Sequence, residues 1–276
     1  MHIELTGYPK PWLLFWIAGI IALGYMVMAF YRKWQKWSQG TPQIPAARNG
    51  KLPITKIWFA EVFCQRQLFG LSPFRWFVHM LIFWGFIWLP FLSIFTIILR
   101  PLEYLGIDGG WARFFFYGNG HAFIKIWGDS FGLALLVGLL AAVMRRLLIR
   151  PTQLVNNRVD VILVAFLLWL TISGFFLEGL HLSLAPAALV RYSFVGKLFV
   201  PPGAYAKAQL QPWLTALWTL HALSGVSFMA YLPHSKLMHS LLAPFVIAMN
   251  ADQEQDRKDM YWPDIKKHRA TGSPRV

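Results

Sequence analysis

The sequence predicts an all-α integral membrane protein with five transmembrane helices. Of its 276 residues, 57% are hydrophobic and 17% aromatic, and only 14% are charged, which is typical of a membrane protein rather than a soluble domain. The apolar residues also form runs that can cross the hydrocarbon layer, for which about 20 helical residues suffice. We expect one membrane domain over 1–249, followed by a polar tail at 250–276, with spans at about 11–31, 74–99, 123–144, 159–180 and 212–245.

The first span is expected at 11–31, with Trp12 and Tyr31 near its two ends. Aromatic side chains at these positions anchor a helix at the membrane interface. The basic segment 32–73 that follows is interrupted by Gly and Pro residues. It is expected to be a long loop with one surface helix at 54–69 lying along the membrane.

The remaining spans are separated by segments that end helices. The second span, 74–99, is followed by a loop rich in Gly and aromatic residues, and the third, 123–144, ends at a pair of arginines. Between the fourth span, 159–180, and the fifth, 212–245, lies a Pro- and Gly-containing loop. Five spans place the two termini on opposite sides of the membrane.

The distribution of positive charge predicts the orientation. Lys and Arg concentrate in the segments after the first and third spans and in the tail, and such residues favour the cytoplasmic side. We therefore expect the N-terminus outside and the C-terminus in the cytoplasm. The net charge of +14 then reflects membrane topology, and we expect no nucleic-acid partner.

Cysteine usage excludes several kinds of site. Cys64 is the only cysteine, so the chain forms no internal disulfide, zinc cluster or iron–sulfur cluster by itself. Any iron–sulfur chemistry must come from a partner chain.

Histidines in the apolar segments are the candidate metal ligands. His221 and His239 are eighteen residues apart in the fifth expected span, a spacing that returns to one helix face after roughly 27 Å. This arrangement suits axial ligation of haem near each side of the membrane. The alternative is that they only form hydrogen bonds to neighbouring helices.

One of these histidines, His239, is expected at the same membrane depth as a histidine on another helix. His79 lies near the cytoplasmic start of the second span and His239 near the cytoplasmic end of the fifth. The two imidazoles are therefore expected at one depth, bracketing one haem. Alternatively, His79 is an interfacial histidine whose ring reaches toward water. His221 lies deeper and would belong to a second, outer site.

Charged residues near these depths suggest further roles. Glu178 is a candidate general base that accepts a proton from a quinol, or else a solvated interfacial carboxylate. Arg75 and Lys236 near the inner site, and Lys125 near the outer one, could pair with haem propionates, or simply extend their charged ends toward the interface. Asp129 is a candidate proton-path or ligand-supporting group.

Several stretches together resemble the respiratory nitrate reductase gamma subunit, a five-helix b-type cytochrome. The resemblance is stronger to the membrane cytochromes of heterodisulfide-reductase-like and sulfite-reductase-associated electron-transfer complexes. It covers most of the chain from the second span onward, and it is carried by RWFVHMLIFWGF (75–86), RRLLIRPTQLVNNRVDVIL (145–163), GFFLEGLH (174–181) and LHALSGVSFMAYLPHSKLMH (220–239).

The resemblance implies haem b between the second and fifth spans. His79 and His239 match the ligands of the inner haem, and His221 matches one ligand of the outer haem. The family's other outer ligand falls on Leu89, which cannot bind iron. We expect two haems with His121 as the substitute ligand. His181 in that role and a single haem remain alternatives.

The implied function is that of a quinone-reactive electron-transfer subunit in the cell membrane. It would exchange electrons between menaquinone or another quinone and a cytoplasmic iron–sulfur subunit of the heterodisulfide-reductase type, within a larger respiratory complex. The rival interpretations are a haem-free membrane anchor and a transporter subunit. An odd number of spans without a visible repeat argues against a transporter.

Overall fold

The computed structural model describes residues 12–39, 56, 59–148, 158–184, 190–203, 207–244 and 246. These residues form helices and connecting turns without any strand, which confirms the predicted all-α fold. The chain divides into two compact units, one comprising 1–28 and 77–231, the other 29–76 and 232–276. The predicted tail at 250–276 lies outside the described residues.

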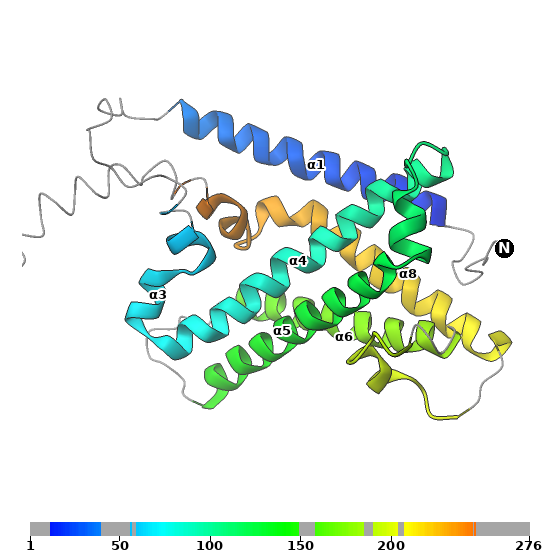
Figure 1. Ribbon diagram of the computed structural model, residues 1–276. Coiled ribbons are helices and arrows are strands. Elements are labelled where there is room, and N and C mark those ends of the chain that lie inside the picture. The colour runs from blue at the N-terminus through cyan, green and yellow to red at the C-terminus, as the bar shows by residue number, and fades with distance from the viewer. Residues whose placement is uncertain are drawn as a thin grey trace, which may run out of the picture. The chain divides into compact units, whose positions relative to one another are not determined.

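Five long helices cover most of the described chain (Figure 1): α1 (Trp12–Ser38), α4 (Pro73–Tyr104), α5 (Gly120–Leu148), α6 (Arg158–Leu184) and α8 (Lys207–Tyr231). Four of them, α1, α4, α5 and α6, are long and apolar enough to span a membrane. The fifth, α8, is less apolar because hydroxyl and imidazole side chains interrupt it at Thr215, Thr219, His221, Ser224 and Ser227. Four of the five predicted spans are therefore supported by length and composition.

The fifth predicted span, 212–245, in which Pro233 is expected to kink the helix, is interrupted at that proline. Helix α8 ends at Tyr231, a 3₁₀ turn follows at η4 (Leu232–His234), and helical structure resumes only at 238–244. Pro233 lacks a backbone N–H and its ring clashes with the preceding turn, so the α-helix stops before it. The Lys33 ammonium donates to the freed Pro233 carbonyl. His221 and His239 consequently do not share one helix face.

Glycines let α4 and α5 approach closely in the first unit. A β-carbon placed on Gly85 would lie 2.6 Å from Leu135 Cβ, and one placed on Gly138 would lie 2.8 Å from Ile82 Cγ1. In a membrane, the hydrophobic effect does not drive helices together, because lipid tails are as apolar as the helices. Small residues at such crossings allow the close van der Waals contact that stabilises the helix pair instead.

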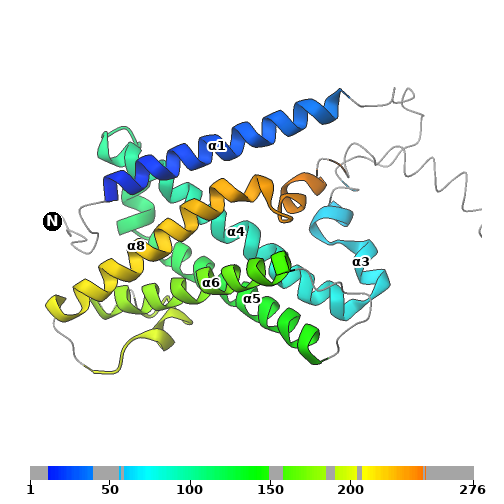
Figure 2. The same cartoon turned by 180° about the vertical axis from the view of Figure 1, so that it is seen from behind.

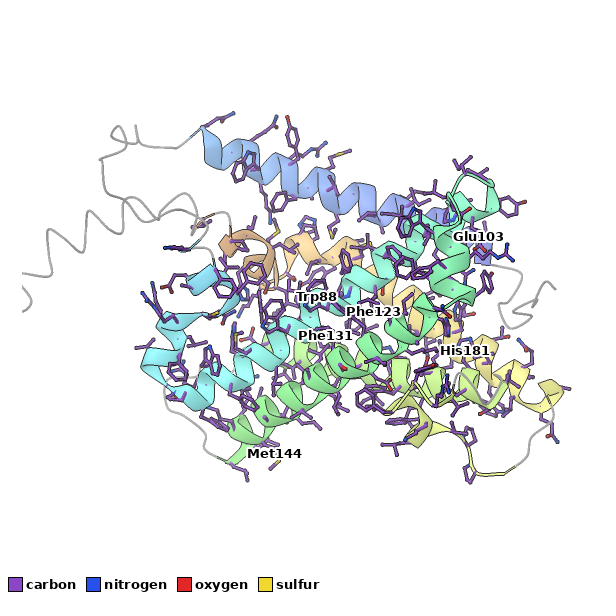
Figure 3. All side chains as sticks on the ribbon, in the orientation of Figure 1. Trp88, Glu103, Phe123, Phe131, Met144 and His181 are labelled. Carbon is purple, nitrogen blue, oxygen red and sulfur yellow. The ribbon has the colours of Figure 1, made fainter. Side chains whose placement is uncertain are left out.

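Aromatic rings continue the same contact along the two helices. The Trp88 ring of α4 meets the Trp127 ring of α5 edge-on at 4.8 Å between centroids, and Trp127 also contacts Phe123 and Phe131. Figure 3 shows Trp88, Phe123 and Phe131 grouped between α4 and α5.

The other helices of this unit extend the core. Helix α6 meets α5 where the Phe175 ring fills the space above Gly132, and it meets α8 through Phe166 and Phe228, whose centroids lie 5.6 Å apart. Seen from behind in Figure 2, α6 runs between α5 and α8. A buried cluster joins α1, α4 and α8: Trp16, Ala22, Ile97 and Met229.

Short helical turns connect the long helices. A π-helical turn, η2 (Arg113–Tyr117), precedes α5, and a 3₁₀ turn, η3 (Gly196–Phe199), lies in the connection between α6 and α8. The Arg100 guanidinium stacks on the Phe116 ring at 3.8 Å and donates to Glu103 at 2.8 Å. This arrangement ties the end of α4 to η2.

The second unit contains the predicted surface helix, which is not continuous. Its described part consists of a π-helical turn, η1 (Phe59–Phe63), and helix α3 (Arg66–Leu71). They are separated at Gln65, whose left-handed backbone (φ 47°) breaks the helix. The Trp76 indole donates to the Cys64 carbonyl at 2.7 Å, which fastens this connection to the start of α4.

We predict that Gly85→Ala destabilises the protein by about 1–3 kcal/mol, because the added methyl group must separate α4 from α5. The measurement is thermal unfolding of the detergent-solubilised chain. Gly225→Ala is the matched control, since a β-carbon there has nothing within 4 Å. Equal melting temperatures for the two variants would contradict the close-packing argument.

Candidate functional site

Helices α5 and α6 carry a set of ionisable side chains in apolar surroundings. On α5, His121, Lys125 and Asp129 follow each other at four-residue intervals, which places them on one helix face. On α6, Glu178 and His181 are three residues apart and so share a face as well. We call these five residues the polar cluster. Figure 3 places His181 on α6, beside the segment that leads to α8.

An ion pair lies at the centre of the polar cluster. The Lys125 ammonium lies 2.5 Å from a Glu178 carboxylate oxygen, with side-chain exposures of 16% and 20%. A β-carbon on Gly196 would lie 2.4 Å from Glu178 Cγ, so the backbone of η3 lies directly against the glutamate. The pair is charge-assisted and largely shielded, and such pairs are stronger than exposed ones.

Asp129 lies deeper on the same face, with 4% exposure. Its Oδ2 atom accepts three hydrogen bonds, from Ser193 Oγ at 3.1 Å, Val195 N at 2.7 Å and Gly196 N at 3.3 Å. A buried carboxylate requires such donors, because its desolvation is otherwise very costly. Asp129 therefore holds the connection between α6 and α8 against α5.

The two histidines of the polar cluster lie within electrostatic range of both Lys125 and Glu178. The Nδ1 atom of His121 is buried and has no hydrogen-bond partner among the described residues. An imidazole nitrogen in this state is available to a ligand or a metal. His121 and His181 are the two residues that the sequence offered as substitutes for the second outer ligand.

His221 on α8 faces α6. Its Nδ1 atom lies 2.8 Å from Ser173 Oγ, and its ring edge approaches Gly174. The contact is the interhelical hydrogen bond expected if His221 is structural. It also resembles the support that a ligating histidine commonly has, in which one ring nitrogen is fixed and the other is available to a metal.

On α4, His79 is largely exposed and its ring lies parallel to Phe83 at 6.5 Å between centroids. The Leu89 carbonyl accepts from Ser93 Oγ at 3.2 Å. Arg75, in the first turn of α4, is exposed. The propionate role of Arg75 stays a prediction.

His239 belongs to the second unit, whereas His79 belongs to the first, so their pairing stays a prediction from sequence. The Nδ1 atom of His239 lies 2.5 Å from the Lys236 carbonyl oxygen. A carbonyl only accepts, so Nδ1 carries a proton, and Nε2 lies 3.5 Å from Ser240 Oγ. The Lys236 side chain is exposed, and its propionate role is likewise untested.

Sequence reasoning named the members of the polar cluster but not their contacts. It gave Lys125 to a propionate and Glu178 to a quinol, whereas the structure pairs the two side chains with each other. It missed Ser173 and Ser193, since an isolated serine in or beside an apolar run carries no signal of its own. Within the described residues, no three His, Cys, Asp or Glu side chains gather to hold a metal ion; a haem needs only axial ligands.

These features define a multi-pass helical membrane protein with an ionisable cluster inside its apolar helices. Residues 92–253, more than half of the chain, match the family model described as nitrate reductase gamma subunit. The chain belongs to that family. This confirms the resemblance drawn from the sequence motifs.

Curated relatives point in the same direction. The chain is 28% identical to a dihydromethanophenazine:CoB–CoM heterodisulfide reductase subunit of Methanosarcina barkeri over 82% of this chain and 76% of that protein, and 27% identical to its Methanosarcina mazei counterpart over the same shares. It is 24% identical to an EtfAB:quinone oxidoreductase of Syntrophomonas wolfei over 87% of this chain but 33% of that protein. No solved structure matches the chain. The relatives support a membrane electron-transfer subunit.

We predict that Lys125→Met and Glu178→Leu each destabilise the protein by about 3 kcal/mol, the low end for a broken buried pair. The double variant should lose less than either single one, because it leaves no unpaired charge. Thermal unfolding of all four forms completes a double-mutant cycle. Additive losses would show that the ion pair contributes nothing.

Proposed function

We propose that this chain is the membrane cytochrome b subunit of a respiratory complex. It exchanges electrons between the quinone pool and a cytoplasmic iron–sulfur subunit of the heterodisulfide-reductase type, through haem b. The observation that carries the proposal is the polar cluster: two histidines and a Lys–Glu pair enclosed by membrane-spanning helices α5 and α6. Ionisable groups on apolar membrane helices are costly and generally mark a functional site.

An outer haem is proposed on His221 and His121. His221 has one nitrogen fixed by Ser173, and His121 has a buried nitrogen without a partner among the described residues. These two would hold the iron, with His181 as the alternative to His121. When bound, haem b supplies one-electron transfer at this side of the membrane.

An inner haem is proposed on His79 and His239. The support is their expected common depth, the family motif, and the hydrogen bond that holds His239 Nδ1 on the Lys236 carbonyl. Arg75 and Lys236 are the proposed partners of its propionates. A single haem remains the alternative arrangement.

The polar cluster supplies the groups for quinol chemistry. Oxidation of a quinol to a quinone releases two protons together with two electrons, so a proton acceptor is needed beside the electron acceptor. Glu178 is the proposed acceptor. Lys125, whose ammonium lies on the carboxylate, orients Glu178 until the quinol hydroxyl takes its place. Menaquinone or another quinone is the proposed substrate.

The proposed orientation has the N-terminus outside and the C-terminus in the cytoplasm. It follows from the concentration of Lys and Arg in the segments assigned to the inner side. A basic inner surface also suits an acidic soluble partner. Iron–sulfur clusters would belong to that partner, because this chain has a single cysteine.

We predict two b-type haems with distinct potentials in the purified complex. His79→Ala and His239→Ala should each remove the same haem, and His221→Ala should remove the other, because an axial ligand holds the iron directly. Pyridine haemochrome content and a redox titration measure both effects. His234→Ala is the matched control, since His234 is also an exposed histidine, at the end of η4, but is not a proposed ligand.

Other outcomes of this titration have clear meanings. One haem that survives His221→Ala would make His221 a structural histidine bonded to Ser173. Loss of the outer haem in His181→Ala but not in His121→Ala would reassign its second ligand. Complete absence of haem would contradict the proposal and leave a haem-free anchor or a transporter subunit.

We predict that Glu178→Gln slows quinol oxidation by roughly 10²–10⁴-fold, because the amide cannot accept the proton. The assay follows quinol-driven reduction of the complex under saturating quinol. Glu103→Gln is the control: Glu103 is also a partly buried glutamate in an ion pair, with Arg100 at 2.8 Å. Equal rates in the wild type and Glu178→Gln would exclude Glu178 as the proton acceptor.

A further inference from the structure

The connection between α6 and α8 lies against α6 over its described part, 190–203, which we call the connector. Its Phe199 ring stacks on Phe175 at 5.5 Å between centroids and meets Phe176 edge-on at 5.1 Å. A β-carbon on Gly179 would lie 2.3 Å from the Phe199 carbonyl oxygen. The backbone of the connector at Phe199 thus packs directly on the backbone of α6 at Gly179. A side chain added at Gly179 would separate the connector from α6.

One end of this contact covers the Glu178 side chain. Gly196, at the start of η3, lies so close that a β-carbon would fall 2.4 Å from Glu178 Cγ. Lys125 contacts the carboxylate of the same residue. The Glu178 side chain is therefore held at two points. The Gly196 backbone lies against its aliphatic part, and the Lys125 ammonium contacts its carboxylate.

Asp129 provides the attachment that keeps the connector there. Its Oδ2 accepts from the Ser193 hydroxyl and from two successive backbone N–H groups, those of Val195 and Gly196. Gly196 donates a hydrogen bond to Asp129 and also lies against Glu178, so this one residue takes part in both contacts. Hydrogen bonds to a carboxylate are shorter and stronger than those between neutral groups.

We propose that Asp129 is a positioning residue for the proton acceptor: it anchors the connector on α5 and thereby fixes the Glu178 carboxylate on Lys125. The inference rests on the proposed function of Glu178. Asp129 itself does not contact the quinol. Its loss releases the connector, lets the Glu178 side chain leave its orientation, and admits water to the polar cluster.

The anchoring part is tested by thiol labelling of the full chain in native membranes. In a Cys64→Ser background, Val195→Cys introduces a thiol at a position that is 5% exposed, which a polar maleimide should modify slowly. Adding Asp129→Ala should accelerate its modification by at least roughly tenfold, as three hydrogen bonds to one charged group are lost. Leu198→Cys, at 75% exposure, is the control that should react quickly in every background.

The functional part is tested by combining substitutions in the intact complex. Asp129→Ala should lower kcat for quinol oxidation by roughly tenfold while the KM for quinol changes little, as expected when orientation of the acceptor is lost. In a Glu178→Gln background the same substitution should have no further effect, because the group it positions is absent. Asp129→Asn keeps one acceptor oxygen and should lie between the wild type and Asp129→Ala in both assays.

Gly196→Ala gives a second test that keeps the Asp129 carboxylate, although its methyl group would also meet the Ser193 hydroxyl that donates to Asp129. Its methyl group would displace the Glu178 side chain and should reproduce the loss in kcat. Gly128→Ala, next to Asp129 but with nothing within 4 Å of its β-carbon, should leave the rate unchanged. Haem content, measured in parallel, confirms that each variant folds.

Two results would overturn the inference. A thiol at position 195 that stays protected in Asp129→Ala would show that Asp129 does not hold the connector. Equal fold-losses from Asp129→Ala in the wild-type and Glu178→Gln backgrounds would show that it acts independently of Glu178. Failure of the proposed function has a different signature, an unchanged rate in Glu178→Gln alone, and the labelling result would still decide the anchoring.

Discussion

The cost of placing charge among apolar helices governs the first unit of this protein. Three charged residues, Lys125, Asp129 and Glu178, lie on helices that are otherwise mostly apolar. Each of the three finds its partner inside the protein: the lysine and glutamate bind each other, and the aspartate binds the connector. Because an unpaired charge there would be far more costly than a broken surface contact, these interactions fix how α5, α6 and the connector fit together.

Close helix packing serves the same requirement. Gly85 and Gly138 bring α4 onto α5, and Gly132 admits the Phe175 ring between α5 and α6. Tight contacts exclude lipid and water from the interior, which raises the strength of electrostatic interactions there. Bis-histidine ligation and a shielded proton acceptor would both benefit from such surroundings. The aromatic residues around Trp88 and Trp127 extend this packing along α4 and α5.

The sequence was sufficient for the all-α class and for the positions of α4, α5 and α6, because each apolar run ends at charged or turn-forming residues. It defined the fifth span less well, because the apolar character continues past Pro233 whereas helix α8 ends at Tyr231. Composition cannot tell whether a proline kinks a helix or ends it, because that depends on the backbone geometry at the proline.

The candidate site was predictable in part. Histidines and a glutamate in apolar spans stand out, so His121, His221 and Glu178 were identified. Their partners were not, because Lys125 and Glu178 are 53 residues apart in the chain and only the packing of α5 on α6 joins them. The contacts of Asp129 with Val195 and Gly196 use backbone groups, which have no residue-type signature at all.

Because α8 ends at Tyr231, the separation of His221 and His239 depends on the turn that follows and is not set by the pitch of one helix. On a continuous helix, inserting or deleting one residue would rotate His239 by about 100° and remove it from its face. Here the 3₁₀ turn at Leu232–His234 and the residues before 238 separate two helical pieces, and turns absorb length changes that helices cannot. Evolution can therefore adjust the orientation of one histidine without disturbing the other, so the two histidine positions are free to diverge independently among related chains.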